Sequence, residues 1–300
     1  MAMSLKDDLR GAGFRGEVLT EEPLGPMTTW RIGGPAELLA TPLDVDDVIR
    51  AVAWANGRDL AWRVLGNGSN LLIRDGGVRG LVLRIRKALD AIEITGSRVL
   101  AGAGASLPAL ANAAAEEGLA GVEFGAGIPG CVGGAIVMNA GWHEFEVGNV
   151  VHAVTYLESD GMVAKYSHYA SRFGYRTSAF RGRRGVVLFA EFALTRDDPA
   201  AVKDRLLHFA DSRKANQPTE LPSCGSVFLK PEGDFAGRLI EAAGLKGRKL
   251  GGIQVSEKHA NFFVNRGGGT ASDVLALVGE VERAVFEKFG VRLTREFETW

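Results

Sequence analysis

The stretch that decides the fold reads Leu65-Gly66-Asn67-Gly68-Ser69-Asn70-Leu71-Leu72. It follows a run of β-forming residues, 62–65, so the glycines come directly after a predicted strand. Glycine has no Cβ, and a row of its backbone N–H groups can surround a pyrophosphate. The side chains of Asn67, Ser69 and Asn70 add further donors and acceptors. Taken alone, the loop is equally compatible with a tight turn between two strands.

A second glycine cluster reads Gly125-Ala126-Gly127-Ile128-Pro129-Gly130 and matches the pattern G-x-G-x-x-G. The dinucleotide-binding βαβ unit needs a strand before this pattern, a helix after it and an acidic residue about 20 positions on. Here the preceding strand is weak, Gly133 and Gly134 are expected to interrupt a following helix, and His152 and Ala153 stand near position 150. We interpret the two clusters as facing glycine loops that bind a large dinucleotide, outside a βαβ fingerprint.

The composition is that of an ordinary globular protein, with 46% hydrophobic and 24% charged residues in a chain of 300. A net charge of −1 shows no basic excess for nucleic acid. No apolar run reaches the roughly 18 residues of a membrane span, and the start of the chain lacks a signal-peptide core. Cys131 and Cys224 have neither a disulfide framework nor metal-ligand spacing. We expect a cytoplasmic protein without a nucleic-acid partner, a membrane contact or a metal site.

The order of predicted elements indicates an α+β fold in two major parts. Strands and loops extend to about residue 193, a bridging helix follows, and two helices with about four strands complete the chain. The predicted helices cover 44–56, 107–117, 199–216, 235–243 and 271–289, and the predicted strands cover 62–65, 81–85, 99–101, 150–157 and 186–192. The segment 154–165 predicts a hairpin around Ser159-Asp160-Gly161. The helix 199–216 is expected to bury Val202, Leu206, Leu207 and Phe209.

Five motifs together are more specific than any one of them. They read Leu65-Gly66-Asn67-Gly68-Ser69-Asn70-Leu71-Leu72, Gly127-Ile128-Pro129-Gly130 through Gly133-Gly134-Ala135 to Met138-Asn139-Ala140-Gly141, Tyr175-Arg176-Thr177-Ser178, Cys224-Gly225-Ser226-Val227-Phe228 and Thr294-Arg295-Glu296. In this order they resemble the UDP-N-acetylenolpyruvoylglucosamine reductases of bacterial peptidoglycan synthesis. The resemblance extends from about Thr28 to Glu296, nearly the whole chain.

The resemblance implies a two-lobed FAD-binding domain of the vanillyl-alcohol-oxidase type at 1–199, with the lobes divided near 65–90. A smaller C-terminal α+β substrate domain at 200–300 is implied to carry Glu296 on its last strand. The family uses FAD and NADPH to reduce the enolpyruvyl ether of UDP-N-acetylglucosamine enolpyruvate to UDP-N-acetylmuramate. Only 50 residues separate Arg176 from Ser226, so the chain resembles the type that lacks an inserted tyrosine loop.

The resemblance also assigns three catalytic residues, and each has a plainer alternative. Arg176 is implied to hold the substrate carboxylate, since a guanidinium matches a carboxylate in two hydrogen bonds; alternatively it is a solvated surface arginine. Ser226 is implied to donate a proton, or else to be a turn serine bonded to its own backbone. Glu296 is implied to act from its protonated form, or else to be an edge-strand glutamate. Glu298 departs from the family, in which a basic residue is common at this position.

The remaining implied contacts fall into two groups. The implied FAD contacts are Gly66, Asn67, Gly68, Ser69, Asn70, Gly127, Cys131, Gly133, Gly134, Asn139 and Arg213. The implied substrate contacts are Tyr175, Gln217, Lys230, Lys246 and His259. Trp30 is expected to be a core anchor, and a monomer or weak oligomer is expected. Two other classes stay open: another FAD oxidoreductase of the same fold that acts on an alcohol or sugar lactone, and a non-catalytic UDP-sugar binding protein.

Overall fold

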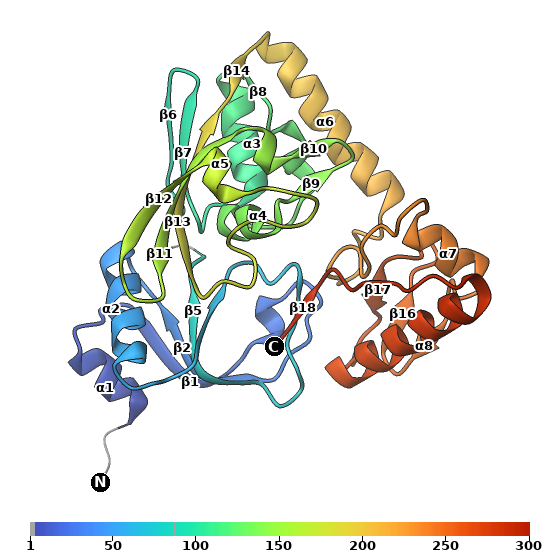
Figure 1. The fold of residues 1–300 in the computed structure, drawn as a ribbon, viewed down its shortest axis with the longest axis horizontal. Coiled ribbons are helices and arrows are strands. Elements are labelled where there is room, and N and C mark those ends of the chain that lie inside the picture. The colour runs from blue at the N-terminus through green and yellow to red at the C-terminus, as the bar shows by residue number, and fades with distance from the viewer. Residues whose placement is uncertain (1–3, 87) are drawn as a thin grey trace. The chain divides into compact units, whose positions relative to one another are not determined.

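The structure, a computed structural model, describes residues 4–86 and 88–300. These residues form two compact units, and each unit collects three segments of the chain (Figure 1). The first unit takes in the chain up to Glu22, Glu37–Asn67 and Arg79–Ser212, and the second takes in Pro23–Ala36, Gly68–Val78 and Arg213–Trp300. The second unit therefore includes two segments from the N-terminal third of the chain.

The first lobe of the first unit is a four-stranded sheet with two helices. Its strands lie in the order β1 (Glu17–Pro23), β2 (Pro35–Thr41), β5 (Val78–Arg84) and β3 (Trp62–Leu65), with β3 and β5 parallel. The helices are α1 (Leu5–Gly11) and α2 (Val45–Asn56). Leu38, Val48 and Leu83 lie in the apolar core of this lobe and are fully buried. This core positions β3, which leads directly into the 66–70 loop.

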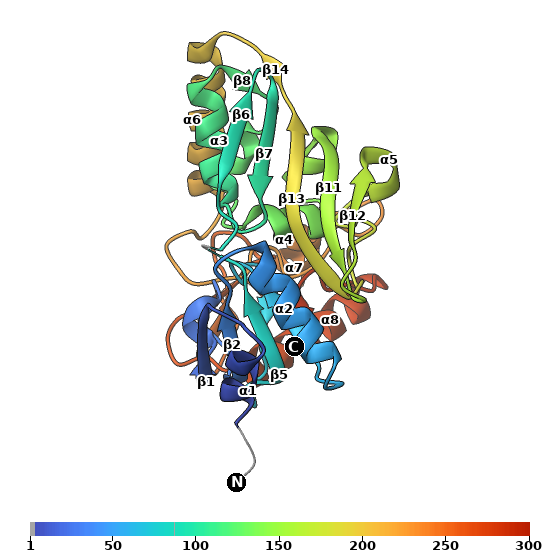
Figure 2. The same ribbon diagram turned by 90° about the vertical axis from the view of Figure 1, so that its left-hand side faces the viewer.

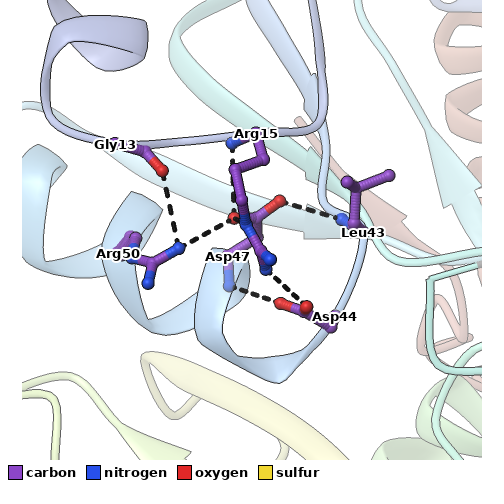
Figure 3. Close-up of polar contacts among 6 residues, drawn as sticks. All are labelled: Gly13, Arg15, Leu43, Asp44, Asp47 and Arg50. Carbon is purple, nitrogen blue, oxygen red and sulfur yellow. Dashed lines mark hydrogen bonds and ion pairs between the residues drawn. The ribbon is translucent and has the colours of Figure 1, made fainter.

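A buried carboxylate fixes the start of α2 against the segment before β1. Asp47 is fully buried, and it accepts hydrogen bonds from the backbone N–H of Arg15 at 3.3 Å, from Arg15 Nε at 3.1 Å and from the backbone N–H of Leu43 at 3.1 Å (Figure 3). Asp44 caps the helix by accepting the N–H of Asp47, and it also pairs with Arg15. Because an isolated charge is costly to bury, these donors are what allow Asp47 to occupy the interior.

The second lobe is a five-stranded antiparallel sheet, whose strands lie side by side in Figure 2. Their order is β12 (Val163–Ser167), β11 (Val151–Glu158), β13 (Gly185–Ala193), β7 (Arg98–Gly102) and β6 (Ile92–Thr95). The core of this lobe joins the sheet to the helices α3 (Leu107–Glu116) and α4 (Val132–Met138). Smaller pieces are β8 (Leu119–Ala120) with β14 (Thr195–Arg196), β9 (Gly141–Trp142) with β10 (Phe145–Glu146), α5 (His168–Ser171) and the start of α6 (Pro199–Asn216).

The second unit surrounds its own apolar core. It contains α7 (Ala236–Ala242), α8 (Ala271–Phe289), the sheet β15 (Lys249–Leu250), β16 (Ile253–Val255) and β17 (Phe263–Asn265), and the parallel pair β4 (Leu71–Leu72) and β18 (Glu298–Thr299). Trp30 is fully buried here and donates its Nε1–H to the carbonyl of Phe263 at 2.7 Å. Its ring meets Phe297 edge to face, with centroids 5.3 Å apart. Trp30 is therefore a core anchor, as expected.

The predicted elements are confirmed wherever strong caps or strand patterns mark them. The helices 199–216 and 271–289 and the strand 62–65 have the predicted bounds, and the hairpin at 159–161 joins β11 to β12. The prediction that Leu207 is buried in α6 is wrong, because its side chain is 49% exposed. Within the described residues, no helix combines the length and the apolar character needed to span a membrane.

The expectation that Gly133 and Gly134 interrupt any helix is also wrong, since both lie inside α4. Glycine weakens an isolated helix, but packing outweighs that tendency here. A Cβ on Gly133 would lie 3.0 Å from Ala103 Cβ, so the glycine allows α4 to approach the end of β7 closely. The residues before the G-x-G-x-x-G pattern form the short strand β8 and a 3-10 turn, Glu123–Gly127, so the βαβ fingerprint is absent there.

Candidate active site

In the first unit, the start of the 66–70 loop lies against the loop that leads into α4. A Cβ on Gly66 would be 2.4 Å from Cys131 Sγ, so this close approach requires glycine. Asn67 donates its side-chain amide to the carbonyl of Pro129 and accepts from Arg86 Nη1 at 2.9 Å. The two glycine loops therefore contact each other through these residues, as the sequence predicts.

At the N-terminus of α4, the N–H groups of Val132 and Gly133 already donate to the carbonyls of Ala105 at 2.8 Å and Ala103 at 2.9 Å, which leaves the backbone at Gly134 as the part that can approach an anion. Cys131 occupies the N-cap position, but its side chain makes no capping hydrogen bond. Gly134 is exposed in the first turn, and the nearest atom to a Cβ there would be Cys131 Sγ at 3.8 Å. Uncapped N–H groups at the start of a helix attract phosphates. Gly127 ends the 3-10 turn that precedes α4, so Gly127, Cys131, Gly133 and Gly134 all lie on or next to the short segment between that turn and the helix.

The second half of the 66–70 loop belongs to the second unit. Gly68 has φ +58°, and a Cβ there would lie 2.8 Å from the carbonyl oxygen of Met27, so no larger residue fits. Asn70 donates its side-chain amide to the carbonyl of Glu296 at 3.3 Å, and its own carbonyl accepts the backbone N–H of Glu298 at 3.0 Å. The half-buried Ser69 lies between Gly68 and Asn70. Asn70 thus connects the loop to the C-terminal strand.

Arg176 stands at the tip of a two-residue turn in the first unit. Gly174 and Thr177 exchange both backbone hydrogen bonds at 3.0 Å, which leaves Tyr175 and Arg176 at the turn. Arg176 has φ +53°, a conformation that side chains other than glycine rarely adopt. Its guanidinium carbon lies 5.4 Å from the centroid of the Tyr175 ring, and Tyr175 is 55% exposed. A strained, aromatic-flanked arginine at a turn is typical of a functional position.

Two backbone carbonyls orient the guanidinium. Arg176 donates to the carbonyl of Asn139 at 3.4 Å and to that of Gly141 at 2.8 Å. Asn139 is fully buried, adopts φ +45° and ends α4. Both polar ends of its side chain bond within the protein, to the carbonyl of Gly174 at 2.9 Å and to the N–H of Gly148 at 2.8 Å. Contact of Asn139 with a cofactor stays a prediction.

Ser226 and Glu296 come from neighbouring extended segments of the second unit. The N–H of Glu296 donates to the carbonyl of Val227 at 2.9 Å, one residue after Ser226. Ser226 forms a bridge with Phe262 and follows Gly225, whose φ of +84° turns the chain. Within residues 4–86 and 88–300, the Ser226 hydroxyl makes no hydrogen bond. The alternative of a turn serine bonded to its own backbone therefore does not describe this side chain.

Asn261 holds the Ser226 segment in place and was missed in the sequence. Its backbone carbonyl accepts the N–H of Val227 at 2.8 Å. Its side chain accepts the N–H of Phe228 at 3.0 Å and donates to the carbonyl of Phe228 at 2.8 Å. The residue is 7% exposed. A single asparagine between apolar neighbours gave no signal of this role.

The pKa of the Cys224 thiol is raised by burial and by its neighbour Glu296. Burial raises the pKa of the Cys224 thiol well above its ordinary value, and the charge of Glu296 raises it further. Cys131 is also a buried free cysteine. Because its thiol stays protonated, Cys224 is expected to be unreactive and structural in character. The described residues contain no group of three or more His, Cys, Asp or Glu side chains that could hold a metal ion.

Arg213 and Gln217 each carry a polar group that is largely removed from water. Burial lowers the pKa of Arg213 to about 10, and burial is the only cause of that shift. Gln217 has a side-chain oxygen that is buried and accepts no hydrogen bond from the described residues. The N–H of Gln217 donates to the carbonyl of Arg213 at 2.9 Å, which places the two residues on one helical turn. The desolvated guanidinium favours an anionic ligand, and the amide oxygen that accepts no hydrogen bond from the described residues favours a polar one.

The other predicted substrate contacts lie on the second unit. Lys246 pairs with Glu241 at 3.0 Å, and Lys230 places its Nζ 4.5 Å from the centroid of the Phe235 ring. His259 accepts the N–H of Asn261 on Nδ1, so its neutral ring carries the proton on Nε2. Burial lowers the pKa of His259, and the charge of Lys246 lowers it further. His259 is therefore neutral at pH 7 and can donate one hydrogen bond from Nε2.

The predicted residues thus gather in two groups. The first unit holds Gly66, Asn67, Gly127, Cys131, Gly133, Gly134, Asn139, Tyr175 and Arg176, and the second holds Gly68, Ser69, Asn70, Arg213, Gln217, Ser226, Lys230, Lys246, His259 and Glu296. Two of the three predicted catalytic residues, Ser226 and Glu296, lie in the same unit on adjoining segments. The functional roles of all these residues stay predictions.

Two family models match the chain. The model for the C-terminal domain of UDP-N-acetylenolpyruvoylglucosamine reductase matches residues 217–300, and that for an FAD binding domain matches 36–167. The UDP-N-acetylenolpyruvoylglucosamine reductase of Moorella thermoacetica is 45% identical over 288 residues, which are 96% of this chain and 95% of the relative. Likeness at this level extends over both units.

Solved structures agree with the sequence matches. The crystal structure of UDP-N-acetylenolpyruvylglucosamine reductase from Thermus caldophilus has a TM-score of 0.82 at 37% identity, and it covers 95% of this chain and 99% of that one. Berberine bridge enzyme from Eschscholzia californica has a TM-score of 0.51 at 13% identity over 65% of this chain and 44% of that one, and bears on the fold alone. These likenesses confirm the α+β fold with a two-lobed FAD-binding domain of the vanillyl-alcohol-oxidase type and a C-terminal domain. The chain belongs to the UDP-N-acetylenolpyruvoylglucosamine reductase family.

Proposed function

We propose that this chain is an FAD-containing, NADPH-dependent UDP-N-acetylmuramate dehydrogenase that reduces the enolpyruvyl ether of UDP-N-acetylglucosamine enolpyruvate in peptidoglycan precursor synthesis. The observation that carries the proposal is the Ser226 hydroxyl, which is half-buried, makes no hydrogen bond within residues 4–86 and 88–300, and adjoins the segment of Glu296. Membership of the reductase family supports the same activity. The alternative oxidases and binding proteins do not require this pairing of a hydroxyl and a carboxyl group.

The residues of the two glycine loops fit FAD. The exposed backbone at Gly134 suits its pyrophosphate, and Ser69 and the partly buried, desolvated guanidinium of Arg213 add polar contacts. We infer that the predicted FAD contacts, from Gly66 to Arg213, hold the cofactor. When bound and reduced by NADPH, the flavin would supply the hydride that reduces the vinyl end of the enolpyruvyl group.

Arg176 binds and orients the substrate carboxylate in this proposal. Its guanidinium offers a planar pair of N–H donors, which matches a carboxylate and opposes the negative charge that develops during reduction. Tyr175 provides an exposed aromatic side chain beside it. Because carbonyls already orient Arg176, little rearrangement is needed when the carboxylate binds.

Ser226 moves a proton in this proposal. Its Oγ donates to the α-carbon of the reduced group, where negative charge has accumulated. A serine hydroxyl is a weak acid, so its proton must be replaced after each turnover. Glu296, in its protonated form, stabilises the same charge by donating a hydrogen bond.

The other polar side chains bind the rest of the substrate in this proposal. Gln217, Lys230, Lys246 and His259 contact the UDP-sugar, and the buried unpaired oxygen of Gln217 supports such a contact. We further propose that residues 1–199 form the FAD-binding domain and 200–300 the substrate domain. The protein is proposed to act in the cytoplasm as a monomer or weak oligomer, which light scattering of the purified protein tests.

Anaerobic stopped-flow spectroscopy tests the proposed function. The FAD-loaded protein is first reduced with NADPH and then mixed with UDP-N-acetylglucosamine enolpyruvate, and flavin absorbance at about 450 nm follows both steps. Bleaching by NADPH and recovery on adding the enolpyruvyl ether, with formation of UDP-N-acetylmuramate, support the proposal. A protein that takes up no FAD, or that is reoxidised only by oxygen, contradicts it. An alcohol or sugar lactone that bleaches the flavin directly would indicate the oxidase alternative.

A further inference from the structure

Arg176 is attached to the C-terminal end of α4 by more than its own guanidinium. Ser178, two residues after Arg176, donates its hydroxyl to the carbonyl of Val137 in the last turn of α4 at 2.8 Å. Asn139, the residue that ends α4, donates its side-chain amide to the carbonyl of Gly174 at 2.9 Å. One bond therefore lies on each side of the turn that carries Arg176.

Both attachments are buried and geometrically specific. Asn139 is fully buried and Ser178 is 8% exposed, so water replaces neither bond easily. Gly174 uses one carbonyl to accept both Asn139 Nδ2 and the N–H of Thr177, which fixes the base of the turn. The last-turn carbonyl of Val137 is a helix-end acceptor that the Ser178 hydroxyl satisfies.

The strain at Arg176 explains why such attachments are needed. A φ of +53° is unfavourable for an arginine relative to extended backbone, so an unattached turn would relax to other conformations. Arg181 Nη1 donates to the carbonyl of Arg176 at 2.7 Å and adds a third restraint on the same peptide. With the turn held, the guanidinium meets the carbonyls of Asn139 and Gly141.

We propose that Ser178 and Asn139 are positioning residues that hold the strained Tyr175–Arg176 turn against the end of α4 and so preset the Arg176 guanidinium for the substrate carboxylate. This inference rests on the proposed function, because it assigns Arg176 the carboxylate of the enolpyruvyl ether. Neither side chain needs to touch the substrate. The effect of Ser178 on turnover passes through Arg176.

A double-mutant comparison tests the proposal with FAD-loaded protein. KM and the rate of flavin reduction are measured for Ser178→Ala alone and in an Arg176→Ala background. Ser171→Ala is the matched control, because Ser171 is also a buried serine, and its hydroxyl donates to the backbone carbonyl of Ser167. Ser178→Ala is expected to raise KM for the enolpyruvyl ether about tenfold while NADPH-driven flavin reduction stays within about twofold. In the Arg176→Ala background, Ser178→Ala is expected to raise KM by less than about a further twofold. The proposal is overturned if Ser178→Ala raises KM by the same factor in both backgrounds, or if it leaves KM unchanged in the otherwise wild-type protein.

A second measurement works without substrate and separates this inference from the proposed function. The guanidinium N–H signals of Arg176 are followed by ¹⁵N–¹H NMR in the wild type, in Ser178→Ala and in Asn139→Gly, which retains the left-handed backbone. A restrained guanidinium in the wild type and free rotation in both variants support the proposal, whereas unchanged signals overturn it. A wild type that does not reduce the enolpyruvyl ether contradicts the proposed function, while the NMR result still decides whether the turn is held.

Discussion

Glu296 donates its backbone N–H to the carbonyl oxygen of Val227 at 2.9 Å. Together with the bond from the N–H of Leu229 to the carbonyl of Thr294 at 2.8 Å, this bond places the carboxyl-bearing residue beside the segment of Ser226, although about 70 residues separate them in the chain. Asn261 secures the same segment from its other side. Two groups that the proposed reaction needs at one carbon are therefore held on rigid backbone, which is the arrangement that precise proton transfer requires.

Ser226→Ala is expected to reduce the rate of reoxidation by the enolpyruvyl ether by about 10²-fold, because the proposed proton donor is lost. Flavin reduction by NADPH is expected to remain, since it does not use this hydroxyl. Anaerobic stopped-flow measures the two steps separately, and Ser223→Ala in the same turn is the control. Equal slowing of both steps would show that Ser226 is structural.

Gly134→Ala tests whether a cofactor approaches α4. The new Cβ meets only Cys131 Sγ at 3.8 Å, an ordinary contact, and alanine favours a helix over glycine. The Tm of the FAD-free protein is therefore expected to stay the same or rise, while FAD affinity falls about tenfold or more because the methyl group occupies the approach to the backbone. Gly279→Ala, which has open space in α8, is the control. Unchanged FAD affinity would place the pyrophosphate elsewhere.

Asp47→Ala is expected to lower the free energy of unfolding by about 2 kcal/mol, because it removes the buried carboxylate that accepts hydrogen bonds from Arg15 and from the N–H of Leu43. Urea denaturation of the purified protein measures the change. Asp46→Ala, an exposed carboxylate one position earlier, is expected to change the free energy by less than about 0.5 kcal/mol. A similar effect of both substitutions would contradict the role given to Asp47.

Asp75 should give α8 a stability that depends on pH. Its carboxylate accepts from the N–H of Ala271 at 2.7 Å and from the N–H and hydroxyl of Ser272 at 3.0 and 2.6 Å. Burial acts in the opposite direction, but these hydrogen bonds lower the pKa of Asp75 below its ordinary value. A lowered pKa in the folded state stabilises the protein above the unfolded pKa of about 3.9, and this stabilisation is lost as the pH falls through the folded pKa.

Asp75→Asn is accordingly expected to lower stability by about 0.5 kcal/mol at pH 7 and by less at pH 3, a small effect because solvent screens the exposed carboxylate. Thermal unfolding monitored by circular dichroism at the two pH values measures this difference. Asp90→Asn, at a position outside this cap, is the control. A loss of equal size at both pH values would show that the charge of Asp75 is not responsible.

The sequence predicts the long helices well because their ends carry local signals. The Thr270 side chain caps α8 by accepting the N–H of Asp273, and Gly290 ends the helix with φ +69°. The helix α4 ends at the left-handed Asn139 but has no capping side chain at its start, and its two glycines oppose helix formation, so its close packing against Ala103 supplies what the local sequence lacks. Local capping can be read from neighbouring residues, whereas close packing depends on segments distant in the chain.

The candidate site divides in the same way. Resemblance to a family names Arg176, Ser226 and Glu296, but it gives no reason for their conformations. The bond from Glu296 to Val227, the strained φ of Arg176 and the attachment through Ser178 all depend on tertiary pairing. Sequence spacing does not reveal the bonds of Glu296 and Ser178, because each joins segments that are far apart in the sequence.

The second unit takes Trp30 and Leu72 into its core from the N-terminal third of the chain. A gene fragment encoding only residues 213–300 would lose both side chains and would expose the apolar surface they cover. Such a fragment is expected to aggregate when expressed by itself. Residues 213–300 therefore cannot be exchanged between relatives unless the segments Pro23–Ala36 and Gly68–Val78 are exchanged together with them.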